Sequence, residues 1–278
     1  MIKIENEKAI VQFETKGAQI TSFKMKGQEF EYMWQPEEPF WQGRNPILFP
    51  IVGSPDDKII RIDGQEYTIG NHGFARDSEF QLINQQENWV AFRLQATEKT
   101  RKQYPFEFTL DVIYTLNDCT VDIHYEIHNH SDKMMPFTFG LHPAFTIPFE
   151  DHQTIDDCWL RFSHAEPAVM ELAELNSPNG QKILLSEDLF DKVKTLLFEN
   201  LRSISVTLTN GKRGVTVHFA GYRWLAFWKQ LQAKFVCIEP WHGNSRYGDK
   251  ICELKDFEGM IHLESGRSYT TEYKISFF

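Results

Sequence analysis

Three stretches in which apolar and polar residues alternate constrain the fold of this chain more than any other feature. They cover residues 90–94, 106–112 and 121–127. Successive side chains of a β-strand point to opposite faces, so this alternation is the pattern of a strand with one buried face. The turn-like pair Asn117-Asp118 lies between the second and third stretches, which predicts a hairpin. The centre of the chain should therefore form antiparallel sheet.

The flanking segments favour the same kind of structure. Residues 204–208 and 215–219 alternate across a glycine-rich turn, and residues 59–67 form strand material around Asp63-Gly64. Residues 222–228 are apolar on both alternating faces, with Trp224, Ala226 and Trp228 on one and Leu225 and Phe227 on the other. Such a strand is expected at the centre of a sheet, covered on both sides. Helical periodicity is weak, and the clearest helix is a short one capped by Ser186 and running to Lys192.

No repeat, low-complexity tract or linker divides the 278 residues. Sandwiches often reach this length as one unit, and the aromatic share of 14% supplies a large core. We therefore predict an all-β chain, a large antiparallel β-sandwich with a single domain over residues 1–278.

Charge and hydropathy exclude several classes of function. The net charge of −10 disfavours binding to nucleic acid, which needs a basic surface. No apolar run approaches the ~20 residues that span a bilayer, and the N-terminal segment lacks the apolar core of a secretory signal, so we expect a cytoplasmic protein without a membrane partner. Four cysteines, Cys119, Cys158, Cys237 and Cys252, form no CxxC pair, which favours idle thiols over a zinc ribbon or disulfide framework.

Chemistry-bearing residues gather first at residues 71–76. Here Asn71, His72, Phe74 and Arg76 surround Gly73, a residue that can adopt backbone angles closed to other residues. A histidine can exchange protons near neutral pH, and a guanidinium offers a planar fork of donors to oxygen-rich ligands. Taken alone, the segment would also fit a polar loop with one core histidine. Upstream, residues 32–53 are rich in proline and large aromatics, which is typical of a loop that folds over a site or caps a sheet.

Two further motifs each place a titratable group before a proline. His142 precedes Pro143, and Glu239 precedes Pro240, so both should have extended backbone angles. Glu239 and Trp241 are two residues apart and share a face of an extended chain. A carboxylate beside an indole suits a sugar, whose apolar face stacks on the ring. Each motif alone has a plain structural explanation, a hydrogen-bonded histidine or a solvated glutamate; the conjunction of three favours a site.

Other familiar sites are not indicated. The pair His128 and His130 resembles a metal-binding His-x-His, but no further ligand follows at a suitable spacing, so we expect no metal site. The sequence has no GxSxG elbow, no phosphate-binding GxxxxGK[ST] loop and no GxGxxG fingerprint, which removes the usual support for serine hydrolase and nucleotide-binding functions.

Together the three motifs resemble those of the aldose 1-epimerases, the galactose mutarotase-like superfamily, and most of all its LacX-like branch. The segments that carry the resemblance are NHGFAR at 71–76, GLHPAF at 140–145, IEPWHG at 238–243 and GRNPILFP at 43–50. The resemblance implies a large antiparallel β-sandwich and a cofactor-free isomerase that interconverts the α and β anomers of an aldose. The motifs around the second histidine and the glutamate differ from those of the galactose mutarotases, which leaves the identity of the sugar open.

The resemblance also implies roles for individual residues. Glu239 matches the general base, His142 the general acid, and His72 a second histidine near the ring and anomeric oxygens. Arg44 and Arg76 match basic residues of the site. With Asn71, Phe74 and Trp241 they complete the predicted substrate contacts.

Mutarotation suits these residue types, because one group must take the proton of the anomeric hydroxyl while another protonates the ring oxygen. We expect the base and the acid on opposite sides of the ring, with the carboxylate helping to hold the histidine protonated. A monomer and a homodimer are both compatible with the sequence.

Three alternatives stay open at this stage. The first is a hexose 6-phosphate mutarotase, with Arg44, Arg76 or Arg246 pairing with the phosphate. The second is a non-catalytic carbohydrate-binding or sensing protein, although binding alone does not require an acid and a base. The third is a sandwich lyase or hydrolase domain, for which the sequence shows no carboxylates placed as a pair around a glycosidic bond.

Overall fold

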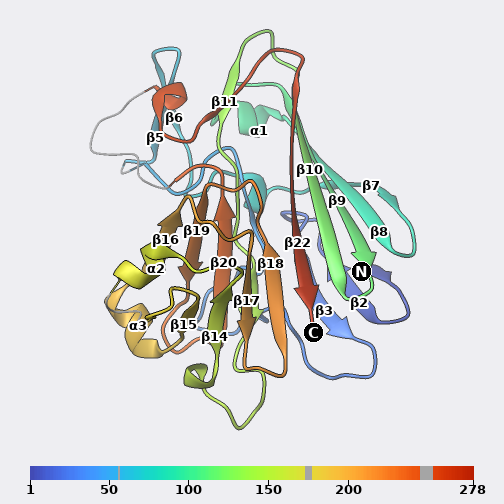
Figure 1. Cartoon of the computed structure of the whole chain (residues 1–278). Helices are drawn as coiled ribbons and strands as arrows, with labels where there is room; N and C mark the ends of the chain where they lie inside the picture. The colour runs from blue at the N-terminus through green and yellow to red at the C-terminus, as the bar shows by residue number, and fades with distance from the viewer. Residues whose placement is uncertain (56, 173–176, 245–252) are drawn as a thin grey trace.

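Two antiparallel sheets dominate the computed structural model, which describes residues 1–55, 57–172, 177–244 and 253–278. The larger sheet has nine strands in the order β15-β14-β17-β18-β22-β10-β9-β8-β7, with its longest strands side by side in Figure 1. In chain order they are β7 (Gln81–Gln85), β8 (Trp89–Gln95), β9 (Phe108–Asn117), β10 (Thr120–Asn129), β14 (Trp159–Phe162), β15 (Lys182–Leu184), β17 (Ser205–Thr209), β18 (Gly214–His218) and β22 (Ser268–Phe277).

The second sheet contains two of the motifs singled out in the sequence, those at residues 140–145 and 238–243. Its strands follow the order β16-β19-β20-β12-β4, and β13 also pairs with β20. They are β4 (Ile47–Leu48), β12 (Gly140–Leu141), β13 (Ala144–Thr146), β16 (Thr195–Glu199), β19 (Trp224–Trp228) and β20 (Phe235–Trp241).

The remaining elements are short. A three-stranded sheet holds β1 (Ile2–Glu5), β2 (Ala9–Phe13) and β3 (Ile20–Met25), and two-stranded pairs join β5 (Ile59–Ile62) to β6 (Gln65–Thr68) and β11 (Met135–Phe137) to β21 (Ile261–Leu263). The helices are α1 (Glu98–Arg101), α2 (Pro167–Glu171) and α3 (Glu187–Lys192), with 3-10 turns η1 (Ala75–Asp77), η2 (Ile155–Asp157) and η4 (Leu254–Asp256).

The alternating stretches form strands as predicted. In the β9–β10 hairpin, Leu116 faces Val121 and Tyr114 faces Ile123, and all four side chains are buried. Their apolar face belongs to one cluster of buried residues that draws members from Ile4 to Phe277. The prediction of an all-β antiparallel sandwich is therefore confirmed, and the hairpin formed by β17 and β18 is confirmed with it.

Strand β19 is covered on both faces, as its sequence predicts. Leu225 and Phe227 belong to the main core, where Phe227 meets Phe162 of the nine-stranded sheet at 5.9 Å between ring centroids. Trp224 and Ala226 are also buried, but in a separate small cluster with Trp241. The second sheet thus packs one face against the sandwich core and turns the other towards a pocket.

The helices are few because little of the chain has a 3.6-residue apolar period. Ser186 accepts a hydrogen bond from the Leu189 backbone N–H and caps α3, as the sequence predicts. No sequence pattern predicted α1, a single turn capped by Thr97. A helix this short is fixed by its cap and not by a repeating pattern.

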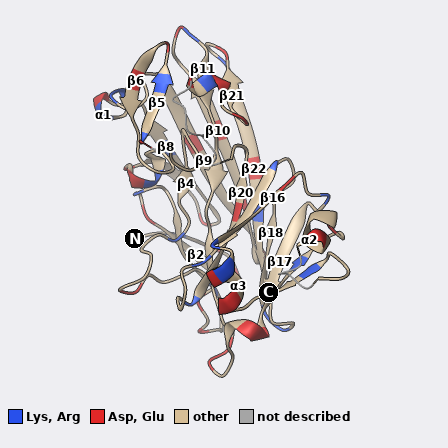
Figure 2. Cartoon of the chain, turned by 90° about the vertical axis from the view of Figure 1, so that its left-hand side faces the viewer, with Lys and Arg blue, Asp and Glu red and all other residues tan. Residues whose placement is uncertain are grey.

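The helices are short, and charged residues are spread over the chain. In the described part of the chain, no helix is long and apolar enough to cross a bilayer. Figure 2 shows acidic and basic residues distributed over many elements.

Gly73 brings the turn at residues 71–76 against the strand segment at residue 49. It has a φ of +74°, and the backbone N–H groups of Phe74 and Ala75 both donate to the Phe49 carbonyl, at 3.0 and 3.2 Å. A Cβ at Gly73 would overlap that same carbonyl oxygen. Glycine is required here by both the backbone angle and the close approach.

The Gly73→Ala variant should therefore be clearly less stable than the wild type. A non-glycine residue in this conformation costs about 1–3 kcal/mol, and the overlap with Phe49 adds to that. Gly64→Ala is the matched control, because Gly64 has a φ of +79° but open space around its Cβ. Urea unfolding should show a larger fall in the midpoint for Gly73→Ala. Equal losses in the two variants would show that the close approach contributes nothing.

Candidate active site

Strand pairing places His142 directly across from Glu239. Gly140 pairs with Trp241 on one side of His142, and Ala144 pairs with Cys237 on the other, so position 142 faces position 239 in register. The Pro143 carbonyl accepts a hydrogen bond from the Ile238 backbone N–H at 3.1 Å, which fixes this part of the strand. The two proline-flanked motifs found in the sequence therefore meet on adjacent strands.

The two side chains are in contact and almost completely buried. His142 Nε2 lies 3.2 Å from Glu239 Oε2, and only 10% and 2% of the respective side chains are exposed. Burial raises the pKa of the Glu239 carboxyl well above its usual value, with Trp241 acting in the opposite direction. Burial also lowers the pKa of His142 well below its usual value, and His72 and Arg76 lower it further. Both shifts disfavour the charged forms.

At pH values between the two shifted pKa values, the pair therefore holds one proton in total. In that range the pair can both give and take a proton. Either His142 or Glu239 carries the proton and can donate it, and the other residue can accept one. The sequence predicts that the carboxylate holds His142 protonated, with the two groups on opposite sides of a sugar. Burial instead favours the neutral imidazole, and the groups lie side by side on neighbouring strands.

His72 enters the pocket from the tight turn and has a defined tautomer. Its backbone φ is +62°, its N–H donates to the Gly53 carbonyl, and its Nδ1 accepts from the Gly53 N–H at 2.9 Å. Since Nδ1 is an acceptor, the neutral ring carries its proton on Nε2. Burial, followed by the charge of Arg76, lowers the pKa of His72 to about 3. His72 is thus a hydrogen-bond donor at neutral pH and not a source of acid protons.

Three indoles form walls around the acid–base pair. Trp41 lies 4.9 Å from the His142 ring and Trp228 lies 5.7 Å from it, while Trp241 approaches His72 at 6.5 Å, all between centroids. Two glycines make room for them. A Cβ at Gly140 would come within 2.7 Å of the Trp241 ring, and a Cβ at Gly43 would overlap the ring of Trp41.

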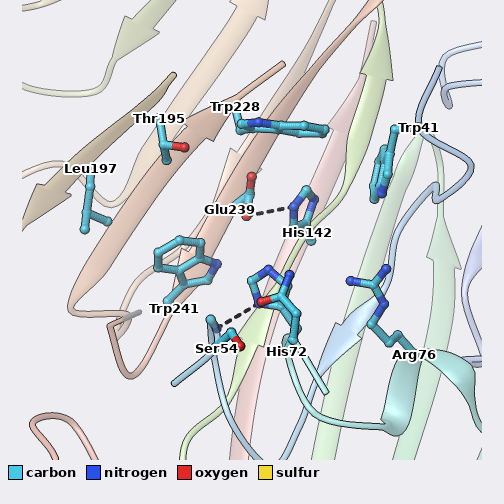
Figure 3. Close-up of a pocket in the computed structure, with 12 residues that line it drawn as sticks. Trp41, Ser54, His72, Arg76, His142, Thr195, Leu197, Trp228, Glu239 and Trp241 are labelled. Atoms are coloured by element: carbon cyan, nitrogen blue, oxygen red, sulfur yellow. Dashed lines mark hydrogen bonds and ion pairs between the residues drawn. The ribbon is translucent and has the colours of Figure 1, made fainter. Parts of the chain in front are cut away.

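The pocket between these walls has a volume of about 690 Å³, within the roughly 300–1,000 Å³ typical of small-molecule sites. Figure 3 shows Glu239 and His142 at its centre, with Trp41 and Arg76 on one side and Thr195 and Leu197 on the other. Its lining residues are Trp41, Gly53, Ser54, Asn71, His72, Arg76, His142, Thr195, Leu197, Trp228, Glu239 and Trp241.

The structure brings together six of the eight residues singled out in the sequence: Asn71, His72, Arg76, His142, Glu239 and Trp241. Phe74 and Arg44 are the exceptions. Phe74 packs in the main core against Phe49 and Phe108, at 6.1 and 6.0 Å between ring centroids, because the turn directs it away from the pocket. Arg44 is not among the lining residues, and its Nη1 lies 4.0 Å from Glu14.

Arg76 is the only lysine or arginine among the described lining residues. Its Nε lies 3.8 Å from Asp77, and 27% of its side chain is exposed. Arg246, which the sequence offered as a phosphate contact, lies outside the described residues, as does Cys252.

Sequence reasoning missed Trp41, Trp228, Thr195, Leu197 and the segment at Gly53. Trp41 lies in the aromatic-rich loop that was expected to cover a site, but nothing singled it out there. Thr195 and Leu197 belong to β16, whose partner β19 is about 30 residues away in the chain. Such long-range pairing leaves no local signal.

Three donors in the described chain lie close enough together to hold a metal ion. The donor atoms of His142, Cys237 and Glu239 are all within 4.8 Å of one another, and all three residues are buried. The rings of His128 and His130, which the sequence suggests as a His-x-His pair, lie 4.2 Å apart, but His128 contacts Ser268 and His130 contacts Thr109. His242, the neighbour of Trp241, points away from the pocket and contacts Thr271 at 2.8 Å.

The geometry suits proton transfer to and from a small polar molecule between aromatic walls. An acid and a base 3.2 Å apart can act on two oxygens carried by one carbon, and the His72 Nε2–H can donate to one of them.

Known proteins resemble this chain in both sequence and fold. A family model described as aldose 1-epimerase matches residues 1–276. Protein LacX of Lactococcus lactis subsp. lactis is 33% identical over 265 residues, which is 88% of each chain. A galactose mutarotase related enzyme from Lactobacillus acidophilus has a TM-score of 0.90 at 30% identity, covering 100% of this chain and 97% of that one. A galactose mutarotase-like protein from Lactobacillus casei has a TM-score of 0.90 at 26% identity, with both chains fully covered.

Proposed function

The chain belongs to the aldose 1-epimerase family, and on this premise we propose that it interconverts the α and β anomers of a hexose by acid–base-catalysed opening and closing of the pyranose ring. The observation that carries this proposal is the buried pair of His142 and Glu239, 3.2 Å apart at the centre of a pocket walled by indoles. Family membership makes the protein a sugar isomerase. The substrate and the residue roles below are our inference.

The reaction needs two proton transfers, one at each of the two oxygens bonded to the anomeric carbon. The anomeric oxygen O1 and the ring oxygen O5 are both bonded to C1, so an acid and a base side by side can reach both. In the opening step, the member of the pair that lacks a proton takes the O1 proton. The other member gives its proton to O5, the C1–O5 bond breaks and C1=O1 forms. Positioned proton transfer of this kind is worth about 10²- to 10⁴-fold in rate.

Closure reverses these transfers on the other face of the aldehyde. After rotation about the C1–C2 bond, O5 attacks C1, its proton returns to the group that supplied it, and O1 recovers a proton from the other. The pair ends with one proton, as it began. Both transfers are assigned to side chains of the chain, so the proposed mechanism needs no cofactor.

The other lining residues bind and polarise the sugar. His72 donates from Nε2 to one of the reacting oxygens, stabilising negative charge as it develops there. The indoles of Trp41, Trp228 and Trp241 offer apolar faces to the pyranose ring and exclude water. Asn71 and Arg76 are placed to hydrogen-bond the remaining hydroxyls.

A free hexose suits this pocket better than a hexose 6-phosphate. A phosphate group is usually held by more than one donor of positive charge or by a helix N-terminus. Arg76 is the single cationic side chain among the described lining residues, and Arg44 faces Glu14 instead. A non-catalytic sugar-binding protein is disfavoured because binding does not require the buried acid–base pair.

Polarimetry of freshly dissolved α-D-glucose and α-D-galactose tests the proposal. Wild-type protein should speed the approach to the equilibrium rotation in proportion to its concentration. Hexose 6-phosphates, added as competitors, should inhibit the reaction of the free sugar weakly if the substrate is unphosphorylated. They should inhibit it strongly if Arg76 binds a phosphate group. No acceleration for any free or phosphorylated aldose would contradict the proposed activity.

A further inference from the structure

Cys237 is a buried thiol next to the acid–base pair, and the proposed reaction does not use it. It precedes Glu239 by two residues on β20 and shares its face of the strand. Cys237 is fully buried and clusters with Trp34, Ala144 and Phe235, while Trp41 and Trp228 pack against that cluster. The sulfur therefore lies directly behind the pocket centre, covered by two of the pocket walls.

We propose that His142, Cys237 and Glu239 form a binding site for a single Zn²⁺ ion, which occupies the pocket in competition with the sugar. Nitrogen, sulfur and carboxylate oxygen are the three donor types that Zn²⁺ takes in proteins. Three protein ligands leave a fourth position of the tetrahedron, and here it faces the pocket, because His142 and Glu239 both line it.

Distances in the cluster are close to those of a zinc site. Zinc bonds of about 2.0–2.3 Å place tetrahedral donors roughly 3.3–3.7 Å apart. His142 Nε2 and Glu239 Oε2 are 3.2 Å apart, and all three donor atoms fall within 4.8 Å of one another. The distances that involve Cys237 are therefore at most about 1 Å longer than the spacing of a tetrahedral site.

Charge balance favours a divalent ion in this buried place. Binding displaces the thiol proton of Cys237 and the proton shared by His142 and Glu239, so an ion of charge +2 replaces two protons. The thiolate and the carboxylate then neutralise the ion, and no net charge is added to the interior. Arg76 is the nearby cation that opposes entry. A thiolate and an imidazole select Zn²⁺ over Mg²⁺ and Ca²⁺, which prefer oxygen ligands.

Metal binding can be tested without any sugar turnover. Co²⁺ is used as a spectroscopic probe, and Zn²⁺ stoichiometry is measured by equilibrium dialysis. Wild type should bind one Zn²⁺ per chain, and its Co²⁺ complex should show a thiolate-to-metal charge-transfer band that Zn²⁺ abolishes. Cys237→Ala should lose the band and bind Zn²⁺ at least about tenfold more weakly. Cys158→Ala is the matched control, because Cys158 is also a fully buried free thiol.

The proposal that Zn²⁺ competes with the sugar rests on the proposed function, and steady-state kinetics test it. Buffered Zn²⁺ should raise the apparent KM for the aldose while leaving kcat unchanged, EDTA should reverse the effect, and Mg²⁺ should have none. Cys237→Ala should keep its basal activity and resist Zn²⁺. Cys237→Ser, which is nearly isosteric, should behave in the same way. It replaces Cys237→Ala if that variant does not fold.

The two proposals can fail separately. Absence of sugar turnover with an intact Co²⁺ band would overturn the enzyme function alone. Absence of a thiolate band in wild type, or equal Zn²⁺ affinity in the Cys237→Ala and Cys158→Ala variants, would overturn the metal site.

Discussion

Glu239→Gln is expected to lower kcat for anomer interconversion by about 10²- to 10⁴-fold, with little change in KM. The substitution keeps the shape of the side chain and one oxygen that can face His142 Nε2. It removes the ability to take and return a proton, so the pair can no longer serve both oxygens of the anomeric carbon. The rates should be measured by polarimetry at saturating sugar.

The matched control for this variant is Glu31→Gln. Glu31 is a partly buried carboxyl whose pKa burial also raises, and it accepts hydrogen bonds from Ser22, Phe23 and Met33 outside the pocket. We expect it to retain wild-type kcat. Full activity in Glu239→Gln, with the melting temperature unchanged, would remove Glu239 from the proton-transfer pair.

His142→Ala should also lose about 10²- to 10⁴-fold in kcat, and added imidazole should restore part of the loss by filling the cavity. Rescue separates a role in proton transfer from a role in packing, since a packing defect does not require an imidazole. His242→Ala is the control: His242 is a partly buried histidine just beyond the end of β20, where it contacts Thr271, and burial lowers its pKa to about 4. It should keep its activity and gain nothing from imidazole.

The pH dependence of His142→Ala gives a second readout. In wild type the pair is active while it holds one proton. Activity should therefore fall in acid only when a second proton binds to the pair. Because burial lowers the pKa of His142, this should happen at a pH well below the usual pKa of a histidine. In His142→Ala the lone Glu239 has a raised pKa and must lose its proton to act as a base. Residual activity should rise with pH, and a profile identical to that of wild type would contradict the shared-proton scheme.

Much of the fold could be read from local patterns. The β9–β10 and β17–β18 hairpins follow from alternation and turn residues, and the two-sided burial of β19 follows from its apolar run. The order of the strands in the nine-stranded sheet could not be predicted from the sequence, because β22 pairs with β10 and β18, which are far away in the chain. Local propensity says nothing about such partners. The assignment of residues 1–278 to a single domain stays a prediction.

The site shows the same division. His142 and Glu239 could be chosen because each precedes a proline and belongs to a recognisable motif, yet their contact depends on the register of β12, β13 and β20. Phe74 was grouped with His72 because the two are neighbours in sequence. The turn at Gly73 sends His72 into the pocket and Phe74 into the core, and sequence proximity could not distinguish these directions.

Exchange NMR at anomeric equilibrium tests the central claim most directly. With α- and β-glucose or galactose already equilibrated, magnetisation transfer between the two C1–H signals reports interconversion itself. Wild-type protein should increase the exchange rate in proportion to its concentration, and Glu239→Gln at the same concentration should leave it near the uncatalysed rate. Exchange unaffected by wild-type protein, or increased equally by both proteins, would contradict the assignment of this pocket as a mutarotase active site built on His142 and Glu239.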